Sequence, residues 1–246
     1  GVMGNKSVQD ELDETMEKPV WLPKASIHYS WNRNVANYAT VTRGYKSGGF
    51  NSTIEDPEYE TFGPEFATNY EVGMKGSFLK RRLNINSAFY YIDWKDQQVY
   101  QPVPSGQGSM LLNAGESHSM GAELELKFRP ISNLVFFSNF AYTEAKYDKY
   151  QRDTETNYSG NFIPYIPRAT FNVGGDYRFH LKNKFVEEVR LHSSYEGTGK
   201  HFWNDENTIK EDYYGTVNLR LTAVTNHLTF SVWAKKSSII WTALFW

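Results

Sequence analysis

The sequence predicts an all-β fold, a segment of an antiparallel transmembrane β-barrel with about eleven strands. Three observations predict it: polar and apolar residues alternate strictly, short and long connections alternate, and aromatic residues gather at segment ends. A period of two places successive side chains on opposite faces of a strand. One apolar and one charged face fit a wall between lipid and a polar lumen.

The chain divides into an arm and a barrel segment. Residues 1–20 are polar and acidic without a repeating apolar position, so we expect a loop or disordered arm there. Residues 21–246 form the expected barrel segment, in which Tyr70 and Val72 alternate with Glu71 before a basic turn at 79–82. No convincing helix is found. The expected strands are 25–31, 35–45, 68–78, 83–91, 121–129, 134–147, 170–180, 185–195, 212–223, 228–234 and 240–246.

The connections alternate in length. Long polar loops are expected at about 46–65, 101–116, 148–167 and 196–211, and short turns lie between them. Outer-membrane barrels have short periplasmic turns and long extracellular loops, so the alternation follows from topology. Expected strand lengths of about 9 to 13 residues match what a tilted strand needs to cross the hydrocarbon layer. The short connection 235–238 is the exception to the pattern.

Aromatic residues are in excess, with 17 Tyr, 16 Phe and 7 Trp among 246 residues. At strand ends such side chains suit the two membrane interfaces, where an amphipathic ring is favoured. The alternative is that they pack the core of a soluble sandwich. The residues expected in the membrane girdle are Trp31, Tyr91, Trp94, Tyr142 and Trp233.

The composition argues against several classes of protein. The net charge is −2 and the basic residues are scattered, so no nucleic-acid partner is expected. The absence of cysteine removes disulfides and thiolate metal sites, and the six histidines lack metal-ligand spacing, so no metal and no cofactor are expected. Glu123 and Glu125 could form a glycosidase pair, but they read more simply as a charged lumen wall. We therefore expect no enzyme.

Ligand-binding candidates lie where strands run into long loops. Arg43, Tyr45 and Lys46 precede one loop, and Phe202 and Trp203 lie in another. Arginine and aromatic side chains suit planar or anionic ligands. The glycines Gly48 and Gly49 lack the lysine and the helix of a phosphate-binding loop, so we expect a flexible loop root.

Four stretches resemble the C-terminal half of the barrel of TonB-dependent outer-membrane receptors, over about residues 21–235. They are RGYKSGGFN at 43–51, FGPEFATNYEVGMKG at 62–76, LNAGESHSMGAELELKFRP at 112–130 and YIPRATFNVGGDYRF at 165–179. The resemblance implies a 22-stranded barrel in the Gram-negative outer membrane, plugged by an N-terminal globular domain. It implies import of iron-siderophores, haem, cobalamin or sugars, energised by the TonB complex.

The resemblance also has consequences for partners. It implies contact with outer-membrane lipids, with the TonB complex through a plug domain that this sequence lacks, and with the barrel-assembly machinery. Recognition by the barrel-assembly machinery is expected of the terminal aromatic residue Trp246, although the family's usual element before its last strand is missing. We expect a fragment that does not fold stably alone, since a half-barrel leaves two edges unpaired.

Three other readings stay open at this point. They are an outer-membrane barrel enzyme, a passive porin and a soluble carbohydrate-binding β-protein.

Overall fold

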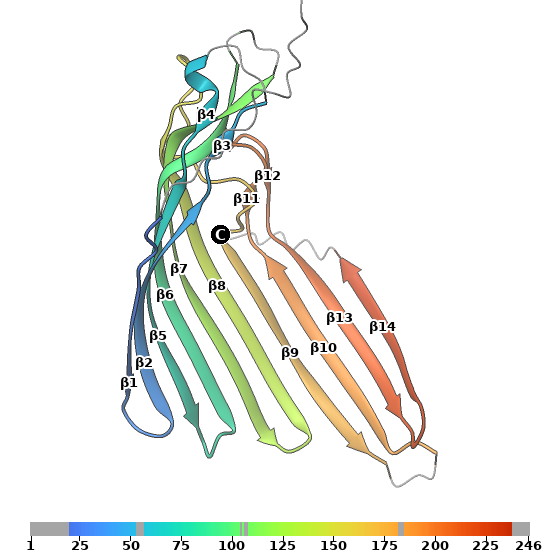
Figure 1. Ribbon diagram of the computed structural model, residues 1–246. Coiled ribbons are helices and arrows are strands. Elements are labelled where there is room, and N and C mark those ends of the chain that lie inside the picture. Colours follow the sequence, from blue (N-terminus) through green and yellow to red (C-terminus); the bar gives the residue numbers. More distant parts are fainter. Residues whose placement is uncertain (1–19, 53–56, 104, 106–107, 182–184, 238–246) are drawn as a thin grey trace, which may run out of the picture.

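The protein forms one large curved sheet, seen in a computed structural model that describes residues 20–52, 57–103, 105, 108–181 and 185–237 (Figure 1). Ten antiparallel strands follow the order β1-β2-β5-β6-β7-β8-β9-β10-β13-β14. Their bounds are β1 Lys24–Ser30, β2 Val35–Lys46, β5 Glu65–Phe78, β6 Leu83–Pro102, β7 Ser109–Ile131, β8 Leu134–Tyr150, β9 Ala169–His180, β10 Glu188–Thr198, β13 Tyr214–Val224 and β14 Thr229–Ser237. Each strand pairs with its neighbour along the chain, as in an up-and-down barrel wall.

Two short ladders lie in the long connections. Strands β3 (Gly49–Phe50) and β4 (Thr61–Phe62) flank a 3₁₀ turn, Pro57–Tyr59, between β2 and β5. Strands β11 (His201–Phe202) and β12 (Lys210–Glu211) lie between β10 and β13. Figure 1 shows all the long connections at one end of the sheet and the short turns at the other. The predicted alternation of short and long connections is present except between β6 and β7, where residues 103–108 alone connect the two strands.

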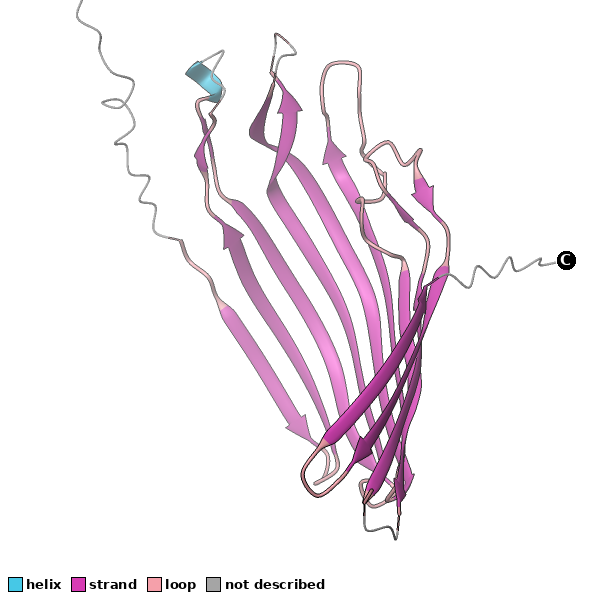
Figure 2. Cartoon of the chain, turned by 90° about the vertical axis from the view of Figure 1, so that its right-hand side faces the viewer, coloured by secondary structure: helices cyan, strands magenta, loops and turns pink. Residues whose placement is uncertain are grey.

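Ten of the predicted strands are present, and the all-β antiparallel fold is confirmed. The sheet bends into an open trough (Figure 2), a segment of a barrel wall in which β1 and β14 each pair on one side only within the described residues. The eleventh predicted strand, 240–246, the terminal Trp246 and residues 1–19 of the predicted arm lie outside the described residues. None of the helices in the described residues has the length and apolar character needed to cross a membrane.

One predicted loop is wrong. Residues 101–116 were expected to be a loop, but β6 and β7 continue as a paired hairpin to Pro102 and Ser109. The pairing resumes after a register shift between Trp94 and Gln98, and the hairpin buries Val99 and Met110. Strand β7 reaches 23 residues, well beyond the expected 9 to 13. The shift hides the continuation because it breaks the period-two pattern on which the prediction depends.

The two faces of the sheet differ in polarity. On the convex face Tyr70 and Val72 are 49% and 53% exposed. The concave face is polar: a hollow that crosses seven strands is lined by residues such as Lys75, Asn86 and Glu125. Tyr38 donates a hydrogen bond to Glu71 there (2.6 Å). The predicted alternation of apolar and charged faces is confirmed.

Aromatic rings lie over glycines on the concave face. A Cβ added to Gly73 would lie 2.5 Å from the Tyr38 ring, which covers it. Gly121 on β7 is covered in the same way by Tyr90 of β6. The Tyr90 hydroxyl lies 2.8 Å from the hydroxyl of Thr143 on β8. Rings that cover glycine backbone link neighbouring strands and fix their register.

The turn between β5 and β6 has unusual backbone geometry. Leu79, Lys80 and Arg81 all have positive φ, at 52°, 56° and 66°. Left-handed conformations cost free energy in residues with a Cβ, and glycine adopts them freely.

We therefore predict that Lys80→Gly stabilises the protein by about 1 kcal/mol. The measurement is the urea midpoint of the intact protein, with its complete barrel, refolded in detergent micelles. Arg33→Gly is the matched control, because Arg33 lies in the short β1–β2 turn and is not among the residues with positive φ. Glycine there should destabilise, and equal effects of the two changes would contradict the explanation.

Candidate functional site

The candidate site is the loop end of the sheet, where the long connections fold together. Loops held on a rigid scaffold are where recognition residues concentrate. Two groups of contacts organise this end: asparagines that pair with distant backbone, and an aromatic-polar cluster that joins two loops.

Three asparagine side chains replace missing strand pairs. The Asn51 amide accepts from the Leu111 N–H (2.7 Å) and donates to the Leu111 carbonyl (2.9 Å). Asn113 does the same with Gly63, at 2.6 and 3.0 Å. Each amide thus satisfies both backbone groups of one partner residue, as a neighbouring strand would.

The third such asparagine joins the β8–β9 connection to the β10–β13 connection. Asn207, in the β10–β13 connection, accepts from the Phe162 N–H (2.7 Å) and donates to the Phe162 carbonyl (2.8 Å). Its own φ of 57° is tolerated by asparagine better than by most residues. We call Asn51, Asn113 and Asn207 the asparagine staples.

The first two staples explain the sequence motifs around them. Asn51 ends the RGYKSGGFN stretch, and Asn113 lies in the LNAGE stretch near the start of β7. Gln98 adds two bonds from its amide, to the carbonyls of Ser47 (2.8 Å) and Gly63 (3.1 Å). A Cβ at Gly48 would lie 2.3 Å from the Phe62 carbonyl oxygen. Gly48 is therefore needed for close backbone approach, which the expectation of a flexible loop root did not include.

A small aromatic core is formed by the end of β8 and the connection from β8 to β9. Tyr147, Tyr150 and Tyr158 are buried and meet edge to face, with ring centroids 4.8 and 5.2 Å apart. Val99 from the β6–β7 hairpin completes this core. Edge-to-face packing favours one relative orientation of the rings, which positions the polar groups at their tips.

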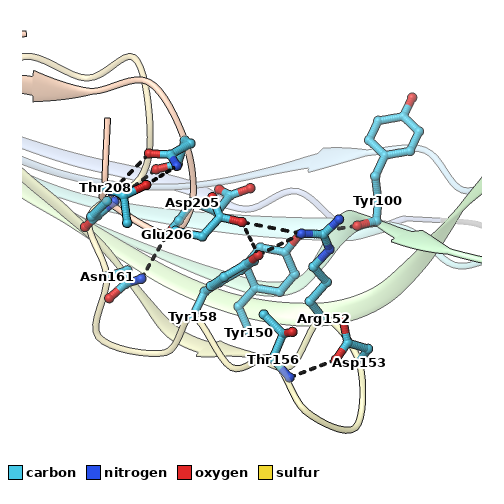
Figure 3. Close-up of polar contacts among 12 residues, drawn as sticks. Tyr100, Tyr150, Arg152, Asp153, Thr156, Tyr158, Asn161, Asp205, Glu206 and Thr208 are labelled. Carbon is cyan, nitrogen blue, oxygen red and sulfur yellow. Dashed lines mark hydrogen bonds and ion pairs between the residues drawn. The ribbon is translucent and has the colours of Figure 1, made fainter. Parts of the chain in front are cut away.

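Those polar groups form a clasp between the two loops. Arg152 donates to the Tyr158 hydroxyl (2.8 Å), and that hydroxyl donates to Glu206 of the next connection (2.5 Å). Tyr147 donates to Asp205 (2.8 Å) in the same way. Figure 3 shows Arg152, Tyr158 and Glu206 pointing toward one another. We call Tyr147, Arg152, Tyr158, Asp205 and Glu206 the loop clasp.

The contacts within the loop clasp shift the pKa values of Glu206 and Tyr158. The hydrogen bond from Tyr158 lowers the pKa of Glu206, because it favours the charged carboxylate. Burial, followed by the bond to Glu206, raises the pKa of Tyr158. At neutral pH the clasp therefore holds a phenol and a carboxylate, the forms in which one donates and the other accepts.

The five predicted ligand-binding residues are not brought together. Arg43 and Tyr45 share the convex face of β2, where the Arg43 guanidinium lies 4.3 Å from the centroid of the Phe66 ring. Lys46 is exposed at the end of β2. Five strands separate β2 from β10, whose following connection holds Phe202 and Trp203.

The other two candidates take part in ring contacts. Phe202 stacks on Phe162 with centroids 5.9 Å apart, and Trp203 meets the exposed ring of Tyr165 edge to face at 5.5 Å. Trp203 is 43% exposed and Tyr165 68% exposed. Both rings of this pair are therefore accessible at the surface of the loop end.

The predicted girdle residues divide between the two faces. Tyr91 pairs with the exposed Tyr70, Trp31 meets Tyr29 edge to face, and Tyr142 pairs with Ala122, so these three share the convex face. Trp94 pairs with Ser117 and Trp233 with Arg220, both on the concave face. Trp94 and Trp233 therefore lie on the opposite face of the sheet from Trp31, Tyr91 and Tyr142, and the girdle stays a prediction. The sequence already contained this information, because Trp94 comes three positions after Tyr91 and successive side chains of a strand point to opposite faces.

Sequence reasoning missed the staples and the clasp. Asn51 and Leu111 are 60 residues apart, and Tyr158 and Glu206 are 48 apart. No local pattern reports such pairs. In the part of the chain that the structure describes, no group of three or more histidine or acidic residues could hold a metal ion.

Comparisons with known proteins agree on one family. The family model described as "TonB dependent receptor-like, beta-barrel" matches residues 5–235. The ferric-pyoverdine 358 receptor of Pseudomonas putida is 27% identical over 66% of this chain and 19% of its own length. The ferrichrome outer membrane transporter and phage receptor of Escherichia coli is 22% identical over 79% of this chain and 24% of its own length.

A solved structure shares the fold. The ferric yersiniabactin uptake receptor from Yersinia pestis superimposes with a TM-score of 0.72 at 23% identity, over 86% of this chain and 31% of that protein. The chain spans about a fifth of the length of the curated relatives that it matches.

We predict that Asn51→Leu accelerates hydrogen exchange at the Leu111 amide by about two orders of magnitude, since about 3 kcal/mol is lost when both backbone groups lose their partner. Amide exchange followed by mass spectrometry or NMR measures it. Asn86→Leu is the control, because that amide donates only to the Glu125 side chain on an exposed surface. Unchanged exchange at Leu111 in the Asn51 variant would refute the staple.

The clasp should weaken in acid. A carboxyl group whose pKa is lowered by folding stabilises above its unfolded pKa of about 4.3 and loses this contribution as the pH falls through its folded value. Amide hydrogen exchange in residues 151–168, corrected for the intrinsic rates at each pH, should therefore become faster below about pH 4. Glu206 is 42% exposed, so solvent screening keeps the change below about tenfold. In Glu206→Gln this acid-induced component should disappear, and an identical pH profile in that variant would contradict the assignment.

Proposed function

Because the chain belongs to the TonB-dependent receptor family, we propose that it forms part of the wall of an outer-membrane active transporter for iron-siderophores or similar small nutrients. The single observation that carries the proposal is the family match over residues 5–235. Relatives named for ferric pyoverdine and ferrichrome, and a fold neighbour named for ferric yersiniabactin, support iron chelates as the cargo class.

The orientation in the membrane follows from the two ends of the sheet. Short turns face the periplasm and long connections face the exterior in barrels of this kind. Tyr91 and Tyr142 then lie toward the outer interface and Trp31 toward the inner one, each against lipid headgroups. Further strands close the barrel across the edges of β1 and β14, because an open edge in lipid leaves backbone groups unpaired. The barrel-assembly machinery inserts such a wall into the outer membrane.

The loop end supplies the extracellular surface that meets the cargo. The staples and the clasp hold the connections in one arrangement, which lowers the entropic cost of recognising a ligand. Trp203 with Tyr165 offers an exposed aromatic surface suited to the planar groups of a chelate. Arg43 and Tyr45 lie on the convex face instead, where they contact the lipid interface. Energy for transport comes from the TonB complex, outside this segment.

The test is uptake of radiolabelled iron as ferric pyoverdine, ferrichrome or ferric yersiniabactin in an iron-limited strain lacking the gene. We expect restored uptake of one of them when the intact gene is returned, and loss of it when the proton-motive force is dissipated. Uptake that survives dissipation would indicate a passive pore.

Substitution tests the aromatic contact. Trp203→Ala should raise the half-saturating chelate concentration about tenfold, in the range of a lost interfacial aromatic. Trp21→Ala is the control, since Trp21 is fully outside the sheet and exposed. An equal change in both variants would remove Trp203 from the contact surface.

A further inference from the structure

Two neighbouring short turns carry four exposed cations. Arg33 lies in the β1–β2 turn, and three consecutive cations at 80–82 lie in the β5–β6 turn. Both turns are at the end of the sheet opposite the long connections (Figure 1), and the Ser77 N–H donates to the Asn34 carbonyl between them (2.8 Å). We call Arg33, Lys80, Arg81 and Arg82 the basic turns.

The basic turns have no carboxylate partner. Residues 18–54, 72–92 and 126–143, which include these turns and the next one, contain no Asp or Glu. Within the described residues none of the four cations forms an ion pair, and Arg82 donates only to the Pro130 carbonyl (3.3 Å). The charge of the turns is therefore available to a ligand outside the chain.

The long connections show the opposite arrangement. Residues 47–64 and residues 199–213 each contain four acidic residues. Lys210, in the second of these connections, pairs with Asp212 (3.3 Å). The excess of cations is thus specific to the short turns and is not a general feature of the connections.

The backbone of the β5–β6 turn is a second observation. Lys80 and Arg81 have positive φ, a conformation that glycine or asparagine adopts at lower cost. Residues held in such conformations cluster where a side chain has a function. Cations at two strained positions therefore indicate that the charge itself is used.

The basic turns lie where the apolar convex face ends. Leu83, which follows Arg82, is opposite Phe128 on β7, and Phe128 is in turn opposite Phe136 on β8. Phe128 and Phe136 are exposed, and Leu79 within the turn itself is 62% exposed. An apolar surface that ends in cations matches a lipid, whose acyl chains end in a charged headgroup.

We propose that the basic turns bind the phosphate groups of anionic phospholipids in the periplasmic leaflet of the outer membrane. Guanidinium groups hold phosphate oxygens through paired hydrogen bonds, and clustered cations beside a membrane-spanning segment attract anionic lipid. The exposed apolar residues beside the turns select a lipid over a soluble anion. The inference rests on the membrane placement proposed above, goes beyond transport of a chelate, and holds whichever cargo is carried.

Fluorescence quenching in defined vesicles tests the proposal without any measurement of uptake. The intact protein, with its complete barrel, is reconstituted into phosphatidylcholine vesicles that contain a small fraction of brominated phosphatidylglycerol or, in parallel, of brominated phosphatidylcholine. A fluorophore on Leu79→Cys reports bromine near the turn, and this thiol is the only one in residues 1–246. We expect about fivefold stronger quenching by the anionic lipid, and a smaller difference at high ionic strength.

Substitution at the strained positions locates the lipid. Lys80→Asn with Arg81→Asn removes two charges without adding strain, because asparagine tolerates positive φ. The preference for the anionic lipid should then fall below about twofold. Lys24→Asn with Lys210→Asn removes the same charge at the loop end and should leave the preference unchanged. Equal quenching by the two lipids, or an unchanged preference in the turn variant, would overturn the proposal.

Inorganic phosphate separates a lipid site from a site for a free anion. Phosphate and sodium chloride at equal ionic strength should weaken the preference equally, because both act by screening. A larger loss with phosphate would overturn the proposal and assign a site for free phosphate. Native mass spectrometry of the unlabelled protein is the second readout, and it decides the question if the labelled protein does not assemble. It should show retention of phosphatidylglycerol over phosphatidylcholine, and equal retention of the two would refute the site.

Discussion

Backbone pairing is the constraint on which the rest of this structure depends. Ten strands form one continuous antiparallel ladder, and in a hydrocarbon environment each unpaired N–H or C=O group would cost several kcal/mol. The constraint extends beyond the strands themselves. Where the connections leave the ladder, Asn51, Asn113 and Asn207 supply the missing donor and acceptor from a side chain. At the other end, Leu79 to Arg81 adopt positive φ so that β5 and β6 stay paired up to the turn.

A fully paired sheet leaves side chains free to differ between its faces, and here they do. The convex face carries exposed apolar and aromatic residues, while the concave face carries carboxylates, amides and cations. Rings laid over Gly73 and Gly121 fill the concave surface locally and hold the register that keeps the faces distinct. A slip of one residue would move charged side chains such as Glu71 and Lys75 to the lipid side. The register that keeps charged side chains on the concave face is therefore also the register that allows the convex face to contact lipid.

The alternation of polar and apolar residues was enough to predict the strands and their two faces. It could not predict contacts between residues that are far apart in the sequence. Ten strands and three of the four long connections followed from the pattern alone, and the resemblance to the receptor family was confirmed by the match over residues 5–235. The extension of β6 and β7 was missed because a register shift interrupts the alternation at Trp94. The concave placement of Trp94 and Trp233 follows from the parity of their positions along the strands, which their location near strand ends does not report. The staples and the clasp join residues many positions apart, and no local rule encodes them.

The two ends of the sheet handle charge in different ways, and this difference argues for different roles. At the loop end, Glu206 is held by Tyr158 and Arg152, and Lys95 and Lys146 on the convex face have carboxylate partners within the same sheet. Near the short turns, Arg178 faces Arg190, Glu188 pairs with Arg190, Asp176 pairs with His192, and Glu125 accepts from the Asn86 amide. A sheet held together by its own ladder can carry such repulsion, because each strand is fixed by many bonds at once.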